Sequence, residues 1–145
     1  MPGEQQVAGG DEAFGRRAPG LEQGGVAGGR GLAVVWNDAA YGAETEFGER
    51  LVNSMWTLST LVGLSVAQLT MGTIVANLGF SEISFPAPMK AGDTLYAETT
   101  VEDKRESKSR PGQGIVTLRH TGRNQHGDVV AVAVRQTLVK CAPAS

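Results

Sequence analysis

A long stretch without charge runs through the middle of the chain, from Leu51 through Thr73. Apolar residues recur there at steps of three, four or seven along one side, namely Leu51, Met55, Leu58, Val62 and Leu69. This spacing predicts a helix from Arg50 to about Leu69, with Gly72 as its C-terminal stop. Because the neighbouring side is uncharged as well, we expect other parts of the protein to cover the helix all round.

Four strand-like segments follow this helix, at about 74–85, 94–104, 114–123 and 128–140. Between Leu95 and Glu102 apolar and polar positions alternate, which predicts a strand with one face in water. Val129 to Val134 is apolar on both faces, so we expect both faces of that strand to be covered. A single helix followed by an antiparallel meander that can curl around it indicates an α+β fold.

Glycine and proline place the breaks between these elements. The segment Asn124 to Asp128 predicts a hairpin turn in which Gly127 takes a positive φ. Pro86 and Pro88 cannot donate a backbone hydrogen bond to a strand ladder, so they mark the end of the first strand.

The N-terminal segment has a different composition from the rest of the chain. Residues 1–31 hold about half of the chain's 20 glycines and show neither helical nor strand periodicity. We therefore predict that residues 1–37 are disordered or non-native, that residues 38–140 form one domain, and that residues 141–145 are a tail.

Composition excludes several classes of protein. Thirteen basic and fifteen acidic residues give a net charge of −2 without a basic block, so nucleic acid is an unsuitable partner. No apolar run reaches the roughly 18 residues of a membrane span, and the N-terminus does not resemble a secretory signal, so we expect a cytoplasmic protein that binds no membrane. The single Cys141 cannot form an internal disulfide, and no residues have zinc-ligand spacing, so no metal is expected.

Three motifs in one order carry a family resemblance: Phe47 to Met55 at the helix start, Phe85 to Thr94, and Asn124 to Asp128. Together they resemble the MaoC-like dehydratase family, which has the hotdog fold, one long buried helix wrapped by an antiparallel sheet. Asn53-Ser54-Met55 and the segment Ser109 to Val116 are most similar to the branch that hydrates mesaconyl-CoA and itaconyl-CoA. The resemblance implies reversible hydration of a short branched or dicarboxylyl 2-enoyl-CoA without a cofactor, by a homodimer or higher oligomer.

The acid and base of such a hydratase are absent from their expected places. Family members carry an Asp, four residues and a His, which place water across the double bond. The corresponding positions here hold Gly31 and Trp36. His120 in a strand and His126 in a hairpin are expected to be structural, so the resemblance leaves open an inactive version of the enzyme.

Other parts of the family's site have counterparts. The resemblance implies that the backbone N–H of Ser54 faces the thioester carbonyl, where a helix N-terminus can stabilise an enolate oxygen, although Asn53 or Ser54 can also simply cap the helix. Phe85 corresponds to a residue that lines the acyl-CoA channel, although a core position is the alternative. Four basic residues could contact CoA phosphates or a substrate carboxylate, or could belong to an ordinary solvated hairpin: Lys104, Arg105, Lys108 and Arg110.

Two further functions remain open at this point. One is a non-catalytic CoA-thioester-binding or regulatory subunit, which pairs with an intact hydratase chain and uses that chain's Asp and His. The other is a hotdog thioesterase, which needs a carboxylate near the helix, and Glu49 is the nearby candidate.

Overall fold

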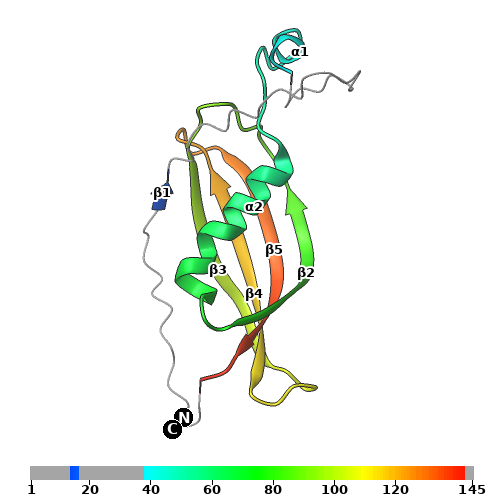
Figure 1. Ribbon diagram of the computed structural model, residues 1–145, viewed down its shortest axis with the longest axis vertical. Helices are drawn as coiled ribbons and strands as arrows, with labels where there is room; N and C mark the ends of the chain where they lie inside the picture. The colour runs from blue at the N-terminus through cyan, green and yellow to red at the C-terminus, as the bar shows by residue number, and fades with distance from the viewer. Residues whose placement is uncertain (1–13, 17–37, 143–145) are drawn as a thin grey trace.

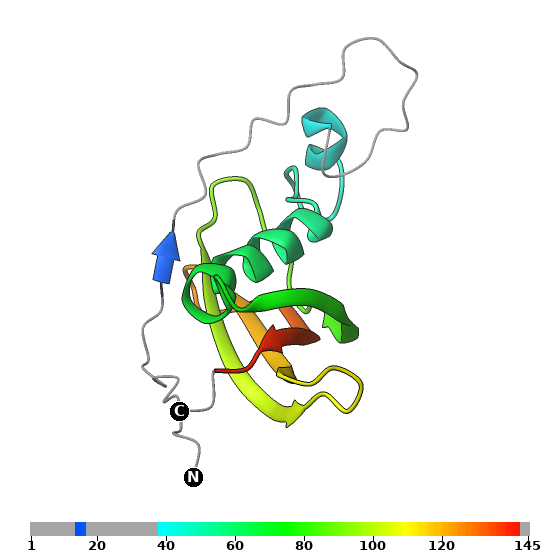
Figure 2. The same ribbon diagram turned by 60° about the horizontal axis from the view of Figure 1, so that its bottom comes forward.

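The chain folds as one antiparallel sheet with a helix across it (Figure 1). The computed structural model describes residues 14–16 and 38–142. Its elements are β1 (Phe14–Arg16), α1 (Ala39–Ala43), α2 (Ser54–Ser65), the π-helical turn η1 (Val66–Thr70), β2 (Ile74–Ser84), β3 (Leu95–Glu106), β4 (Gln113–Arg123) and β5 (Val129–Lys140). The sheet order is β1-β3-β4-β5-β2. Figure 2 shows α2 lying along the inner face of the curled sheet, which confirms the predicted α+β architecture.

The four strands predicted from the sequence are all present, with bounds that differ by two residues or fewer. β3, β4 and β5 are successive antiparallel neighbours, whereas β2 pairs with β5 and forms one edge of the sheet. Gly127, in the turn between β4 and β5, has a φ of 87°, as predicted. Glycine suits this position because a residue with a side chain would be strained at that φ.

The helix begins four residues later than the sequence pattern predicts. Asn53 is its N-cap, and the Asn53 side chain accepts a hydrogen bond from the N–H of Met55 at 2.8 Å. The preceding residues pair with the loop that follows β2, since Leu51 forms an isolated bridge with Lys90 and the N–H of Val52 donates to the carbonyl of Met89 at 2.8 Å. These backbone contacts fix the helix start against that loop.

The expectation that α2 is covered all round is wrong for a single chain. Only one side of α2 is buried, the side that carries Thr57, Leu58, Leu61 and Ser65. Met55, on the other side, is 57% exposed. Edge strand β2 also carries exposed apolar side chains, at Val75, Leu78, Phe80 and Ile83. The uncharged sequence therefore leaves apolar surface at the outer side of α2 and along β2.

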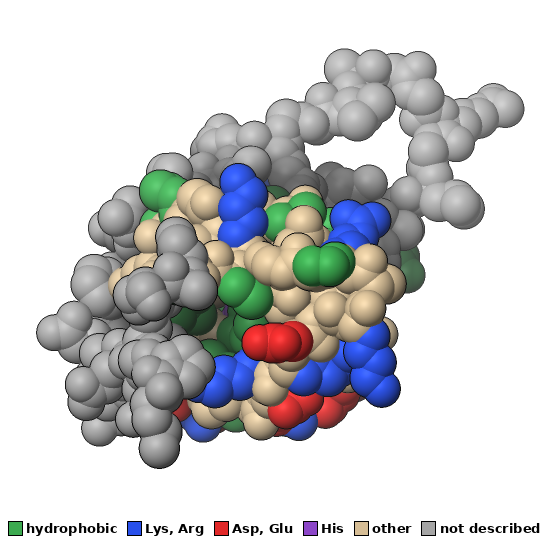
Figure 3. Space-filling view, turned by 90° about the horizontal axis from the view of Figure 1, so that it is seen from below, with side chains coloured by type: hydrophobic (Ala, Val, Ile, Leu, Met, Phe, Trp, Pro, Cys, Tyr) green, Lys and Arg blue, Asp and Glu red, His purple; other side chains and the backbone are tan. Residues whose placement is uncertain are grey.

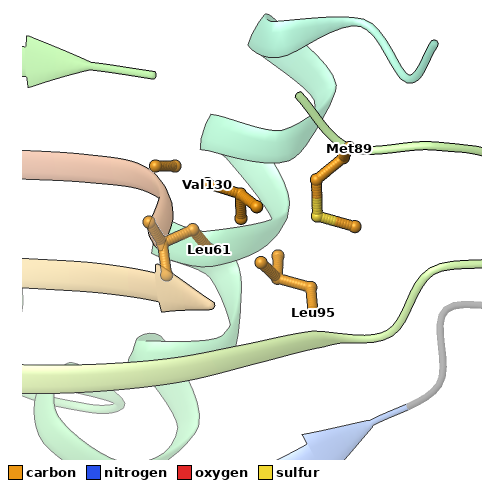
Figure 4. Packing of buried hydrophobic residues seen from close by; sticks show 5 residues of the cluster. Leu61, Met89, Leu95 and Val130 are labelled. Carbon is orange, nitrogen blue, oxygen red and sulfur yellow. The ribbon is translucent and has the colours of Figure 1, made fainter. Parts of the chain in front are cut away.

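The core lies between the middle of α2, at Leu61, and the sheet. Leu61, Met89, Leu95 and Val130 belong to one cluster of buried apolar side chains (Figure 4). A Cβ at Gly122 would lie 3.0 Å from Leu95 Cδ1 and 3.4 Å from Leu61 Cδ2. The glycine on β4 therefore makes room for the side chains that α2 and β3 place over the sheet.

Within the N-terminal segment, Phe14–Arg16 forms the short strand β1, which pairs with β3 opposite Leu95 to Ala97. The sequence pattern did not indicate this strand. The remainder of residues 1–37 lies outside the described residues, so the boundary at residue 38 stays a prediction. Within the described ranges, no helix has the length and apolarity needed to cross a membrane.

Candidate functional site

The start of α2 presents an unused backbone donor. Asn53 has φ −62° and ψ 130°, and its carbonyl accepts a hydrogen bond from the N–H of Thr57 at 3.1 Å while its side chain caps Met55. The N–H of Ser54 donates to no acceptor among the described residues, and Ser54 is exposed. The capping role proposed for Asn53 is therefore present, and it leaves the first N–H of the helix free at the positive end of the helix dipole.

The loop after β2 is bonded to the residues just before this donor. Phe85 is half-buried and packs against the core cluster of Leu61 and Met89. Because Val52 is bonded to Met89, the loop and the helix start lie together at one end of the sheet. The structure thus brings Phe85 to the same end as Asn53 and Ser54. Contact between Phe85 and an acyl chain stays a prediction.

The carboxylate nearest the helix in sequence is already paired. Glu49 Oε1 lies 2.7 Å from Lys90 Nζ, and this ion pair raises the pKa of Lys90. The N–H of Lys90 also donates to Asp93 Oδ2 at 2.8 Å. Both partners of the ion pair are exposed, so the pair adds little to stability. It does occupy the Glu49 carboxylate that a thioesterase would need free.

A glutamine in the β4–β5 turn ties that turn to the same loop. Gln125 Nε2 donates to Asp93 Oδ1 at 2.7 Å, and Gln125 Oε1 accepts from the N–H of Thr94 at 3.1 Å. His126 is exposed beside it, with its Nε2 3.2 Å from Gln125 Nε2. Sequence reasoning missed this link, because a glutamine in a polar turn has no distinguishing pattern.

The candidate CoA-binding residues lie at the other end of the sheet. Lys104 and Arg105 are near the end of β3, and Lys108 and Arg110 are in the following turn, and all are exposed. β3 has 12 residues, so at about 3.3 Å per residue its ends are roughly 36 Å apart. Seen from this lower end, Lys and Arg side chains alternate with acidic ones and form no continuous basic patch (Figure 3). One chain therefore does not bring these residues to Ser54, and their contact with CoA stays a prediction.

Gly31 and Trp36, the positions at which the family's Asp and His are expected, lie outside the described residues. Within the described part of the chain, no group of three or more His, Cys, Asp or Glu side chains could hold a metal ion. His120 is fully buried in β4 and is bonded to Thr99 and Arg135, away from solvent. Its position agrees with the structural role expected from the sequence.

Comparison with known proteins identifies the family. The sequence profile of the MaoC like domain matches residues 36–124, which is more than half of the chain. A mesaconyl-CoA hydratase from Haloarcula marismortui is 35% identical over 95 residues, which are 65% of this chain and 26% of that protein. The chain thus spans about a quarter of the length of this curated relative.

Solved structures agree with this assignment. A MaoC-like dehydratase from Rhodospirillum rubrum superimposes with a TM-score of 0.64 and 32% identity, and the match covers 74% of this chain and 73% of the other. A Mycobacterium tuberculosis protein described as a double hotdog fold superimposes with a TM-score of 0.66 and 25% identity, over 74% of this chain and 33% of its own. The chain belongs to the MaoC-like domain family and has the hotdog fold that its motifs predict.

Proposed function

We propose that this chain is a domain of a MaoC-type hydratase, which adds water reversibly to a short branched or dicarboxylyl 2-enoyl-CoA. The observation that carries the proposal is the free N–H of Ser54 at the start of α2, beside the loop that contains Phe85. The likeness to a protein named mesaconyl-CoA hydratase supports the choice of acyl group.

In this proposal the N–H of Ser54 stabilises the charge that develops during hydration. The oxygen of water bonds to C3 of the enoyl group, and the C2–C3 π electrons move toward the thioester, whose oxygen becomes an enolate. The Ser54 N–H donates to that oxygen, and the dipole of α2 favours the negative charge there. A proton then bonds to C2 and the thioester carbonyl re-forms.

The same reaction needs a base to take a proton from water and an acid to deliver one to C2. Because the expected positions hold Gly31 and Trp36, we propose that the chain as given binds the thioester but does not turn it over alone. The test is an enoyl-thioester absorbance assay with mesaconyl-CoA, itaconyl-CoA and crotonyl-CoA. It compares the given chain with the variant Gly31→Asp/Trp36→His.

Turnover by the double variant alone supports the hydratase proposal. Binding of the thioester without turnover by either chain favours the second candidate function, a CoA-thioester-binding subunit whose acid and base come from a partner domain. That candidate is supported by the Gly31 and Trp36 found where the pair is expected. If neither folded protein binds a CoA thioester, both proposals fail.

We also propose that a second hotdog domain, from another copy of this chain or a related one, covers the apolar edge strand β2. Val75, Leu78, Phe80 and Ile83 expose apolar side chains there, and among the described strands β2 has a paired neighbour on one side only. An exposed apolar edge strand favours pairing with another chain. Pairing of two such edges would satisfy backbone groups and bury these side chains together.

A further inference from the structure

A buried arginine without an acidic partner lies under the C-terminal end of α2. Arg135 on β5 is 2% exposed, and none of the ion pairs within residues 14–16 and 38–142 includes it. A buried cation requires partners that replace water. The acceptors that the structure gives it are neutral: His120 Nε2, 2.9 Å from Arg135 Nε, and Ser65 Oγ, 3.4 Å from Arg135 Nη2.

These contacts fix the protonation state of His120. A guanidinium only donates hydrogen bonds, so Nε2 of His120 must carry a lone pair. The proton of the neutral imidazole is therefore on Nδ1, which lies 2.8 Å from Thr99 Oγ1 and donates to it. Burial first, and the charge of Arg135 second, lower the pKa of His120 to about 4.

The far end of this chain of hydrogen bonds is the last residue of α2. Ser65 Oγ accepts from Arg135 and donates to the carbonyl of Val62 at 2.6 Å. The π-helical turn η1 begins at the next residue and ends at Thr70, whose buried Oγ1 has no hydrogen-bond partner among the described residues. The apolar cluster around Leu61 holds the earlier part of the helix, whereas directional polar contacts hold this end.

We propose that the chain Thr99–His120–Arg135–Ser65 is an acid-labile latch, which holds the end of α2 and the turn η1 against the sheet. Protonation of His120 Nε2 removes the acceptor for Arg135 Nε. Two N–H donors, each on a positively charged side chain, then face each other. Arg135 then loses its position under Ser65, and the end of α2 separates from β4 and β5. The paired strands need not open, because their ladder hydrogen bonds do not involve these side chains.

No other charge within the described residues replaces the contact with Arg135. On β3 the partner of His120 is the hydroxyl of Thr99, on β5 the cross-strand neighbour is Ala133, and α2 carries no charged residue. Edge strand β2 has a single acid, Glu82, which is paired with Arg119. A protonated His120 would therefore face the positive charge of Arg135 and no compensating negative charge among the described residues.

Amide hydrogen exchange of the full chain at pH 7.0 and pH 4.5, corrected for intrinsic exchange rates, tests the latch. If the opened state restores the ordinary His pKa of 6.5, a folded value of about 4 predicts roughly a 60-fold increase in opening from pH 7.0 to pH 4.5. We expect this increase in residues 65–70, at an opening free energy below that of the β4 and β5 amides, because those amides exchange only through global unfolding. His120→Gln, whose amide oxygen can accept from Arg135 but does not titrate, should abolish it, and the exposed-site control His126→Gln should retain it.

Equal protection of residues 65–70 at the two pH values would overturn the latch. So would residues 65–70 that open only together with the amides of β4 and β5, or a pH step that persists in His120→Gln. An NMR titration of the His120 ring in the unaltered chain keeps the test valid if that variant does not fold. Protonation of Nε2 must accompany the loss of protection, and an Nε2 that stays unprotonated while residues 65–70 open contradicts the proposal.

Discussion

The side chain of Asn53 caps α2 by accepting the N–H of Met55 at 2.8 Å. Replacing Asn53 with Ala removes this acceptor and should lower the free energy of unfolding by about 1 kcal/mol. Asn53→Asp keeps a capping oxygen and should retain stability, but its negative charge next to the Ser54 N–H should weaken stabilisation of an enolate. Chemical denaturation of both variants measures the first effect, and hydration rates in an active Gly31→Asp/Trp36→His background measure the second. Equal stability of the Ala and Asp variants would show that the cap contributes nothing.

Leu61 is the central side chain between α2 and the sheet, with no exposed surface. Leu61→Ala should lower the free energy of unfolding by about 2–5 kcal/mol, because it removes buried methyl groups and leaves a cavity next to Leu95 and Val130. Met55→Ala on the same helix is the matched control, since Met55 is 57% exposed. Similar losses for the two variants would contradict this placement of the core.

The exposed edge of β2 predicts self-association. Phe80 is 38% exposed on that strand, and Phe80→Lys should convert an oligomer to a monomer, since a lysine at a paired edge opposes burial. Sedimentation velocity measures the change in oligomeric state. Thr100→Lys is the control, because Thr100 is exposed on β3. An unaltered chain that is monomeric at micromolar concentration would contradict the interface.

The buried His120 predicts a loss of stability in acid. Its folded pKa of about 4 lies below the ordinary value of 6.5, so the unfolded chain binds the proton first. The contribution of His120 is complete above pH 6.5 and declines as the pH falls toward 4, by up to about 3 kcal/mol. Denaturation curves at pH 7.0, 5.5 and 4.5 measure it. His120→Gln should flatten the profile relative to His126→Gln, and parallel profiles would assign the acid sensitivity to other groups.

Sequence periodicity predicted the four long strands and the α+β architecture, because apolar alternation reports directly which face of a strand is buried. It placed the helix start at Arg50, although Asn53, inside the uncharged run, was an available capping signal. It could not predict η1, whose residues have the same apolar character as the helix before them. It also could not predict that Arg135 is buried, since one arginine in a strand normally indicates an exposed position.

The family and its fold followed from motifs, whereas the arrangement of the site required the three-dimensional structure. Phe85 and Ser54 are far apart in the chain and lie at the same end of the sheet because Val52 pairs with Met89. From the sequence, the basic residues from Lys104 to Arg110 could also contact the ligand. The length of β3 separates them from the end that carries Ser54 and Phe85. Spacing along a sequence does not reveal which ends of strands meet.

The central claim is that the N–H of Ser54 stabilises the enolate oxygen, and a pair of substitutions at this residue tests it directly. Ser54→Pro removes that N–H, and Pro is tolerated here because Ser54 is the first helical residue and Asn53 already has a ψ of 130°. Ser54→Ala keeps the N–H and removes only the hydroxyl. The measurement is kcat/KM for enoyl-thioester hydration in the Gly31→Asp/Trp36→His background, with folding of each variant verified by circular dichroism. We expect a loss of about 10²–10³-fold for Ser54→Pro and little change for Ser54→Ala, whereas equal rates for the two folded variants would show that this N–H does not stabilise the enolate.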